Sequence, residues 1–314
     1  LEQFYENPES DYNTYQFFRY HSVYYNTRTT NNALYYGEVK NVTHISQNLF
    51  DSYSRNGYVT GLFKDAWETA TNTYDTPDRN LHHWDHLGGS IACDLAYNNK
   101  TAASLSVFEG KDSSIRKCYY DQEMHNIQLD YVKQFWEAYP ENRKFFRTHF
   151  SEAHELTGEF IKYIDEDLRD HLQYFLDMGY LEDTFITIVS DHGAHAFTLR
   201  FPILPDNSRH IENYLPVLFH ITKKDIPETS KESLKANEQA FISTYDIYSS
   251  LKSLAENKQA KSHEAESYAY ILEEVPNSHD CDDKSEYLRS CWCSQDVDKM
   301  QSKLNDIGIF YNKI

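Results

Sequence analysis

The sequence predicts an α/β fold in which a central, mostly parallel sheet is sandwiched between helices. Two observations support this class. Apolar, β-branched segments alternate along the chain with segments of helical spacing, an order typical of open α/β sheets. Residues 184–189 (TFITIV) are a continuous run of β-branched and aromatic side chains, which is typical of a strand buried on both faces.

The expected elements follow from aromatic and β-branched content for strands and from 3.6-residue spacing for helices. Strands are expected at residues 15–25, 58–63, 144–150, 184–189 and 214–221, the last as the neighbour of the run at 184–189. Helices are expected at residues 127–138, 164–175 and 243–257. Pro140 ends the first helix, and Gly179 lies beyond the end of the second.

We expect one α/β domain over residues 1–257, with an irregular insertion at 71–120. Residues 258–314 are polar and carry cysteines, and we expect them to form a C-terminal appendage.

The charge of the chain excludes one class of partner. Its 314 residues include 30 Lys and Arg against 49 Asp and Glu, a net charge of −19. Such a surface repels phosphate backbones, so we expect no nucleic-acid partner. A phosphate-ester substrate stays compatible with this charge, because a bound metal ion reverses the local field. No run reaches the ~18–20 apolar residues of a membrane span.

Cysteines and glycosylation sequons favour the secretory pathway, with an extracellular or lumenal location. The chain has five cysteines, and Asn41 and Asn99 each begin a sequon. The alternative is a cytosolic protein with buried thiols. A secreted ectodomain and one anchored to a membrane upstream of residue 1 both remain open.

The segment Ser190-Asp191-His192-Gly193 directly follows the predicted strand at 184–189. Ligands of open α/β sheets bind at the carboxyl ends of strands, and Asp and His are both ligands of divalent metals. The sequence therefore predicts a metal site formed by Asp191 and His192. The alternative is a turn in which the Asp caps a helix.

Four ordered segments resemble the alkaline phosphatase-like superfamily, which includes phosphodiesterases, lipoteichoic acid synthases and sulfatases. They are residues 26–37 (NTRTTNNALYYG), 154–159 (HELTGE) followed by 163–165, 184–193 (TFITIVSDHG) and 211–216 (IENYLP). The chain is most similar to a eukaryotic sulfatase-like family long catalogued as a domain of unknown function. Its members share segments like Gly57–Thr60, Trp84–His86, Cys93-Asp94…Cys118 and Cys291-Trp-Cys293.

The resemblance implies a metal-dependent hydrolase or transferase acting on a phosphate ester. Thr27 would be the nucleophile, since it precedes Gly37 by ten residues as the family's nucleophile does. Asp191 and His192 would hold a divalent ion, Zn²⁺ or Mn²⁺, and His154 would contact a substrate oxygen or protonate the leaving group. Sulfatases need a Cys or Ser that is converted to formylglycine, so Thr27 favours phosphate over sulfate esters.

Two departures from the family pattern leave alternatives open. Thr29 and Thr30 replace a Pro-Asn pair, so either could be the nucleophile in place of Thr27. The superfamily's first acidic metal ligand lies on an N-terminal strand, which we expect upstream of residue 1. Without that ligand, the alternative function is a catalytically inactive ectodomain with a structural or binding role.

Two further clusters have alternative interpretations. His82, His83, Asp85 and His86 could bind a metal, but we expect a solvated loop. His279, Cys281, Cys291 and Cys293 could form a zinc site, but the sequons favour disulfides, with Cys281 bonded to Cys291 or Cys293.

We predict that Cys93 and Cys118 form a disulfide. The chain-entropy model assigns a stabilisation of about 3–4 kcal/mol to a disulfide that closes the loop from residue 93 to residue 118. Peptide mapping without reduction should recover the two cysteines in one linked peptide pair. Recovery of both as free thiols would disprove the pairing and weaken the secretory assignment.

Overall fold

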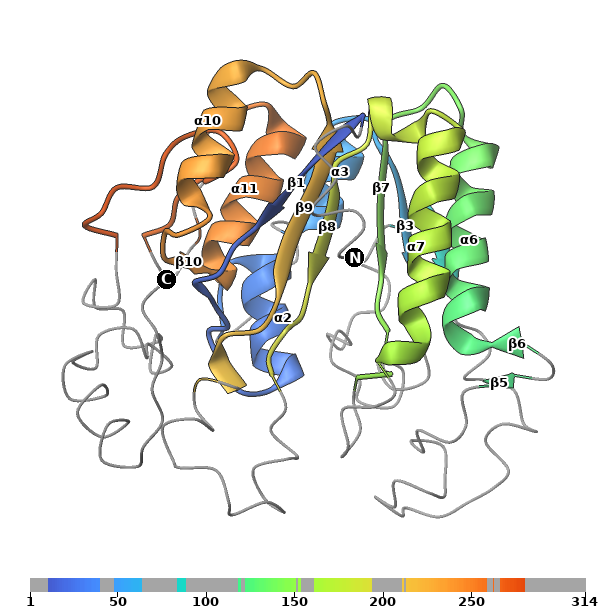
Figure 1. Ribbon diagram of the computed structural model, residues 1–314, viewed down its shortest axis with the longest axis horizontal. Helices are drawn as coiled ribbons and strands as arrows, with labels where there is room; N and C mark the ends of the chain where they lie inside the picture. The colour runs from blue at the N-terminus through green and yellow to red at the C-terminus, as the bar shows by residue number, and fades with distance from the viewer. Residues whose placement is uncertain are drawn as a thin grey trace, which may run out of the picture.

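The computed structural model describes residues 11–39, 48–63, 84–88, 118–119, 122–150, 152–153, 161–193, 211, 213–258, 262 and 266–279. Strands occupy the middle of the molecule in Figure 1, with α6 and α7 on one side and α10 and α11 on the other.

The described strands pair in four groups. An antiparallel sheet has the order β1-β9-β8, formed by Tyr12–Gln16, Leu218–Lys223 and Ile186–Val189. A parallel sheet has the order β4-β3-β7, formed by His86–Gly88, Val59–Phe63 and Lys144–Thr148. Two short pairs complete the set: parallel β2–β10 (Tyr20–His21 and Ile242–Ser243) and antiparallel β5–β6 (Cys118–Tyr119 and Gln122–Glu123).

Six α-helices are described in these ranges: α2 Thr27–Tyr36, α3 Leu49–Arg55, α6 Met124–Ala138, α7 Lys162–Asp177, α10 Glu228–Asn237 and α11 Thr244–Glu256. A 3-10 turn, Tyr180–Glu182, follows α7. Gly37 and Gly179 both adopt the left-handed conformation just beyond helices α2 and α7, where a glycine carries no Cβ penalty.

The sheet β1-β9-β8 is buried on both faces. Tyr15 and Leu218 pack into a cluster with α2, α10 and α11, whereas Tyr12 and Ile221 pack into a second cluster with α6 and α7. Successive side chains of a strand point to opposite faces. Tyr12 and Tyr15 are three positions apart, as are Leu218 and Ile221, so the two residues of each pair lie on opposite faces of the sheet. This sheet therefore lies between two layers of helices.

The predicted α/β class is confirmed, and the strands expected at 58–63, 144–150, 184–189 and 214–221 correspond to β3, β7, β8 and β9. The last two are neighbours as expected, but they are antiparallel. A buried apolar run is compatible with either direction, so the pattern could not decide between them.

Other boundaries differ from the prediction. The strand expected at 15–25 is divided into β1 and β2, because the chain turns at Phe18 and Arg19. Helices α2, α3 and α10 were not predicted from spacing. Strand β4 lies inside the expected irregular insertion and pairs in parallel with β3. Cys281, Cys291 and Cys293 lie outside the described residues.

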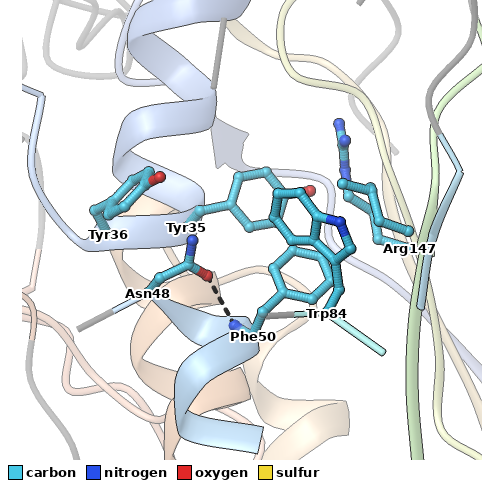
Figure 2. A pocket seen from close by; sticks show the side chains of 7 residues that line it. Tyr35, Tyr36, Asn48, Phe50, Trp84 and Arg147 are labelled. Carbon is cyan, nitrogen blue, oxygen red and sulfur yellow. Dashed lines mark hydrogen bonds between the residues drawn. The ribbon is translucent and has the colours of Figure 1, made fainter. Parts of the chain in front are cut away.

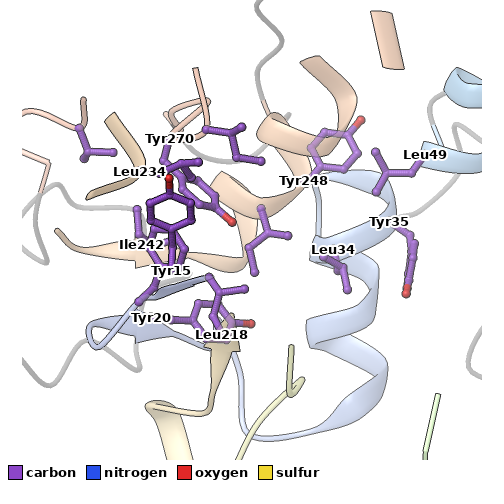
Figure 3. Close-up of a cluster of buried hydrophobic side chains, with 14 of the residues drawn as sticks. Tyr15, Tyr20, Leu34, Tyr35, Leu49, Leu218, Leu234, Ile242, Tyr248 and Tyr270 are labelled. Atoms are coloured by element: carbon purple, nitrogen blue, oxygen red, sulfur yellow. The ribbon is translucent and has the colours of Figure 1, made fainter. Parts of the chain in front are cut away.

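Tyrosine forms much of the main hydrophobic cluster (Figure 3). Tyr20, Tyr248 and Tyr270 are fully buried or nearly so. Their hydroxyl groups need partners in the core: the Tyr20 hydroxyl lies 3.3 Å from Thr244 Oγ1, and the Tyr270 hydroxyl contacts His220 Nε2. Tyr270 belongs to residues 266–279, so this segment, which follows the expected boundary at 257, packs on the same core as the helices.

Helix α2 packs closely against α11 at Gly37. A Cβ atom added to Gly37 would lie 2.5 Å from Cε1 of Tyr248, and the residue has a φ of +70°. Only glycine satisfies both the left-handed backbone and this close approach. The contact sets the distance between the end of α2 and the side of α11.

The carboxylate of Asp246 organises the start of α11. Asp246 is fully buried and accepts hydrogen bonds from the Ser243 backbone N–H (2.7 Å), the Ser243 hydroxyl (2.6 Å) and the Tyr268 backbone N–H (2.7 Å). His279 Nε2 lies 3.2 Å from the same carboxylate. One side chain thus caps α11 and holds residues 268–279 against it.

We predict that Gly37→Ala destabilises the fold more than Gly179→Ala does. Both substitutions place a Cβ on left-handed backbone, which costs about 1 kcal/mol. A Cβ at Gly37 would also collide with the Tyr248 ring, whereas no atom lies within 4 Å of a Cβ at Gly179. We expect a further loss of about 1–3 kcal/mol for Gly37→Ala from overpacking. Urea unfolding measures the difference, and equal losses for the two variants would contradict the close contact.

We predict that Asp246→Asn lowers the free energy of unfolding by about 2–4 kcal/mol, because an amide cannot accept all the bonds that the buried carboxylate accepts. Asp130→Asn is the matched control, since Asp130 lies on a helix and its side chain is 53% exposed. We expect the control to change stability by less than about 0.5 kcal/mol. Thermal and urea unfolding of the two variants should separate them, and similar values would refute the organising role of Asp246.

Candidate active site

The turn after β8 is anchored to the segment that leads into β9. The Ser190 backbone N–H donates to the Val217 carbonyl (3.0 Å), and the Gly193 N–H donates to the Asn213 carbonyl (2.8 Å). Between these anchors, the Ser190 hydroxyl donates to the His192 carbonyl (2.7 Å). The turn therefore holds Asp191 and His192 at the carboxyl end of β8, where the sequence analysis expects them.

Helix α2 begins at Thr27 and delivers this residue to the same place. Asn26 is the N-cap, and its side-chain oxygen accepts from the Thr29 backbone N–H (3.0 Å). Thr27 is thus the first helical residue, at the end of α2 where the helix dipole is positive and favours anions. Asn26 explains the local structure, since Asn is among the best N-cap residues.

Thr27, Asp191 and His192 converge although 165 positions separate Thr27 from His192. The Thr27 Oγ1 atom lies 3.2 Å from His192 Nε2, and Asp191 Oδ2 lies 3.5 Å from the same nitrogen. The Thr27 and Asp191 oxygens are therefore less than about 7 Å apart. Two potential ligand oxygens from distant segments therefore lie close to the same imidazole nitrogen.

The contacts of His192 define which nitrogen carries the proton. Nδ1 lies 2.7 Å from the Gly193 carbonyl oxygen, which can only accept a hydrogen bond. In the neutral ring Nδ1 therefore carries the hydrogen, and the lone pair of Nε2 faces Thr27 and Asp191. This is the tautomer in which Nε2 can bind a metal or accept a proton from the threonine hydroxyl.

Asp191 is held as a carboxylate. Burial raises the pKa of Asp191, but electrostatic interaction with the His192 and His149 imidazoles, the Thr27 hydroxyl and the His192 backbone N–H lower it by more, so the pKa lies below its ordinary value. Its Oδ1 accepts from the His192 N–H (3.0 Å). Its Oδ2 is buried and makes no hydrogen bond within the described part of the chain.

This arrangement fits a divalent metal ion. A buried carboxylate oxygen without a donor is costly unless a cation occupies the space beside it. A carboxylate, a neutral imidazole nitrogen and a hydroxyl oxygen form a donor set suited to Zn²⁺ or Mn²⁺. Asp191, His192 and Thr27 could hold such an ion.

The structure also distinguishes the three threonines at the start of α2. Thr30 is fully buried, and its hydroxyl donates to the Tyr24 carbonyl (3.1 Å) and lies 3.3 Å from the Ser22 hydroxyl. Thr29 contributes its backbone N–H to the cap. Of the three, Thr27 is the one whose hydroxyl contacts His192.

His149 is a site neighbour that the sequence analysis did not identify. It follows β7, and its imidazole contributes to the lowered pKa of Asp191. The guanidinium of Arg147 lies 3.3 Å from His149 Nδ1. A histidine near the end of the predicted strand at 144–150 was the available signal, because carboxyl ends of parallel strands meet at one edge.

Several predicted residues lie outside the described part of the chain: His154, Asn41, Asn99, Cys93, His82 and His83. Asp85 and His86, expected in a solvated loop, instead contact neighbouring elements, and His86 begins β4. Asp85 accepts from the Thr60 N–H (2.7 Å), and His86 contacts the Tyr139 hydroxyl. His279 faces Asp246, as described above.

The hollow shown in Figure 2 is separate from the candidate active site. It lies between α2 and α3, and aromatic rings and Arg147 form its wall: Tyr35, Tyr36, Asn48, Phe50, Leu62, Trp84 and Arg147. The Arg147 guanidinium lies 4.9 Å from the Tyr35 ring centroid. Tyr35 is eight residues beyond Thr27, about 12 Å along the helix axis. Thr27, Asp191 and His192 are not among the residues that line this hollow.

Residues 25–308 match the protein family described as "Protein of unknown function (DUF229)". The chain belongs to this family. The family match confirms the resemblance to a family catalogued as a domain of unknown function. No curated protein matches the sequence.

Two solved structures are similar to this chain. The lipoteichoic acid synthase LtaP from Listeria monocytogenes has 12% identity and a TM-score of 0.50, and the match covers 82% of this chain and 67% of that one. The C-terminal periplasmic domain of phosphoethanolamine transferase EptC from Campylobacter jejuni has 13% identity and a TM-score of 0.47, with 84% and 85% covered. At this identity the LtaP match establishes similarity of fold alone.

Among the described residues, no helix combines the length and the hydropathy required to cross a membrane.

Proposed function

We propose that this DUF229 protein is a metal-dependent hydrolase or transferase that acts on a phosphate ester through Thr27. The observation that carries the proposal is the convergence of Thr27 Oγ1, His192 Nε2 and Asp191 Oδ2 at the end of β8. The superfamily resemblance assigns the nucleophile and two metal ligands to these same three residues.

Asp191 and His192 would hold the ion, with Thr27 as the third ligand. A bound Zn²⁺ or Mn²⁺ would lower the pKa of the threonine hydroxyl and offset negative charge on the phosphoryl group. The Gly193 carbonyl keeps the His192 Nε2 lone pair directed at the site, as carbonyl partners do for metal-ligating histidines.

The chain's own residues then account for the steps. Thr27 Oγ would give up its proton to solvent water and attack phosphorus, and the bond from phosphorus to the leaving oxygen would break. His154, assigned by resemblance, would protonate that oxygen. Water or an acceptor alcohol then attacks the phosphothreonine and releases Thr27. The positive end of α2 stabilises the phosphoryl oxygens during both steps.

The proposal requires a further acidic ligand beside Asp191, His192 and Thr27, as the superfamily resemblance implies.

We place the protein in the secretory pathway, extracellular or lumenal. The two sequons and the clustered cysteines support this location. The substrate class follows from Thr27, which favours a phosphate over a sulfate ester.

We predict that the full-length protein, supplied with Zn²⁺ or Mn²⁺, hydrolyses a generic phosphodiester or phosphomonoester such as a nitrophenyl phosphate. Thr27→Ala should reduce kcat by at least about 10³-fold, because nucleophile and ion act together. Asp191→Asn should cause a loss of similar size, and His154→Ala a loss of about 10²–10⁴-fold. Thr29→Ala is the matched control: its side chain lies two positions away, and we expect near wild-type kcat.

Two outcomes would count against the proposal. A loss with Thr29→Ala but not with Thr27→Ala would move the nucleophile. Equal rates for the wild type and Thr27→Ala, together with no bound ion, would favour the alternative of an inactive ectodomain with a structural or binding role. Circular dichroism of each variant verifies that folding is retained.

A further inference from the structure

A second group of metal-ligating side chains lies at the start of α6, and none of its members belongs to the candidate active site. Glu123, His125 and Asp167 place a carboxylate oxygen, Nε2 and a second carboxylate oxygen within 4.8 Å of one another. His125 Nε2 lies 2.7 Å from Asp167 Oδ2 and 3.2 Å from Glu123 Oε2. An ion with bonds of about 2.0–2.2 Å requires ligand atoms roughly 3.5 Å apart, close to these separations.

The histidine is held in the orientation that a metal ligand needs. His125 is fully buried, and its Nδ1 lies 3.1 Å from Glu152 Oε1, itself almost buried. Nδ1–H donation to Glu152 leaves Nε2 directed between Glu123 and Asp167. A carboxylate that orients the second nitrogen of a ligating histidine is the usual outer partner of a metal site.

The charge of the cluster calls for a cation. Three carboxylates surround one imidazole, so their summed charge stays negative even when the ring is protonated. Within the described ranges, neither Lys nor Arg pairs with Glu123, Glu152 or Asp167. Besides His125, Asp167 has a neutral donor, the Asn126 side-chain amide at 3.3 Å.

Two of the ligands stay accessible to an ion from solvent. The side chains of Glu123 and Asp167 are 34% and 35% exposed, whereas those of His125 and Glu152 are 0% and 6% exposed. Glu123 is the N-cap residue of α6, yet its side chain makes no capping hydrogen bond. The site thus has a buried histidine on its inner side and two partly exposed carboxylates on the side that faces solvent.

We propose that Glu123, His125 and Asp167 bind one divalent transition-metal ion, Zn²⁺ or Mn²⁺, at a site distinct from the candidate active site, with Glu152 orienting His125. Imidazole with two carboxylates suits these ions better than Ca²⁺, which prefers six to eight oxygens. The ligands come from the β5–β6 hairpin, α6 and α7, and Glu152 follows β7. The ion would therefore join the start of α6 to α7 at one end of the α6–α7 layer (Figure 1).

The test uses the whole chain in an Asp191→Asn/His192→Gln background, which removes the ligands of the candidate active site. After treatment with EDTA, this protein should bind one equivalent of Zn²⁺ or Mn²⁺ by calorimetric titration, and its Tm should rise with the ion. Adding Asp167→Asn should weaken binding by more than about 10-fold and abolish the Tm shift, and Glu152→Gln should weaken it about 10–100-fold. Asp170→Asn, on the same helix with a side chain 66% exposed, should leave both unchanged.

The outcome does not depend on catalysis, since the background removes the proposed active site. Equal binding by the Asp167→Asn and Asp170→Asn proteins would overturn the site. Absence of any bound ion in the background protein would also overturn it, and would identify the cluster as a protonated histidine held by carboxylates. The test replaces Asp167 because its side chain is partly exposed, whereas a substitution of the fully buried His125 could prevent folding.

Discussion

The buried carboxylate of Asp246 is the interaction on which the arrangement of the helices depends. It accepts hydrogen bonds from the start of α11 and from the segment at Tyr268, and His279 contacts it from the same segment. A buried charge is tolerated only when such donors surround it. The four contacts therefore specify one position for α11 relative to β10 and to residues 268–279.

From α11 the constraint passes to the candidate active site. Tyr248 on α11 leaves no space for a side chain at Gly37, so the end of α2 is held against it. Asn26 caps the other end of α2 and places Thr27 at the first helical position. The threonine hydroxyl reaches His192 because two rigid elements, α2 and the end of β8, are each fixed independently. Sites on such elements keep their geometry better than sites on loops.

Local features of the chain were predictable because neighbouring residues determine them. The apolar runs identified β3, β7, β8 and β9, and helical spacing identified α6, α7 and α11. The direction of β9 could not be predicted, because a strand buried on both faces has the same pattern in either direction. Helix α10 was missed because its residues, ETSKESLKAN, are mostly polar. Only Leu234 of this helix is a buried apolar side chain, so no helical spacing of apolar residues is visible.

The sequence by itself determined the α/β class, the strand that ends at Ser190-Asp191-His192-Gly193 and, through resemblance, the pairing of Thr27 with that turn. Tertiary structure alone decided which threonine hydroxyl faces His192 and which instead bonds Tyr24. It also assembled Glu123 and His125, Glu152 and Asp167 from three segments that are distant in sequence. Hydrogen bonding and propensity act over a few residues, whereas a distance between remote side chains depends on how whole elements pack.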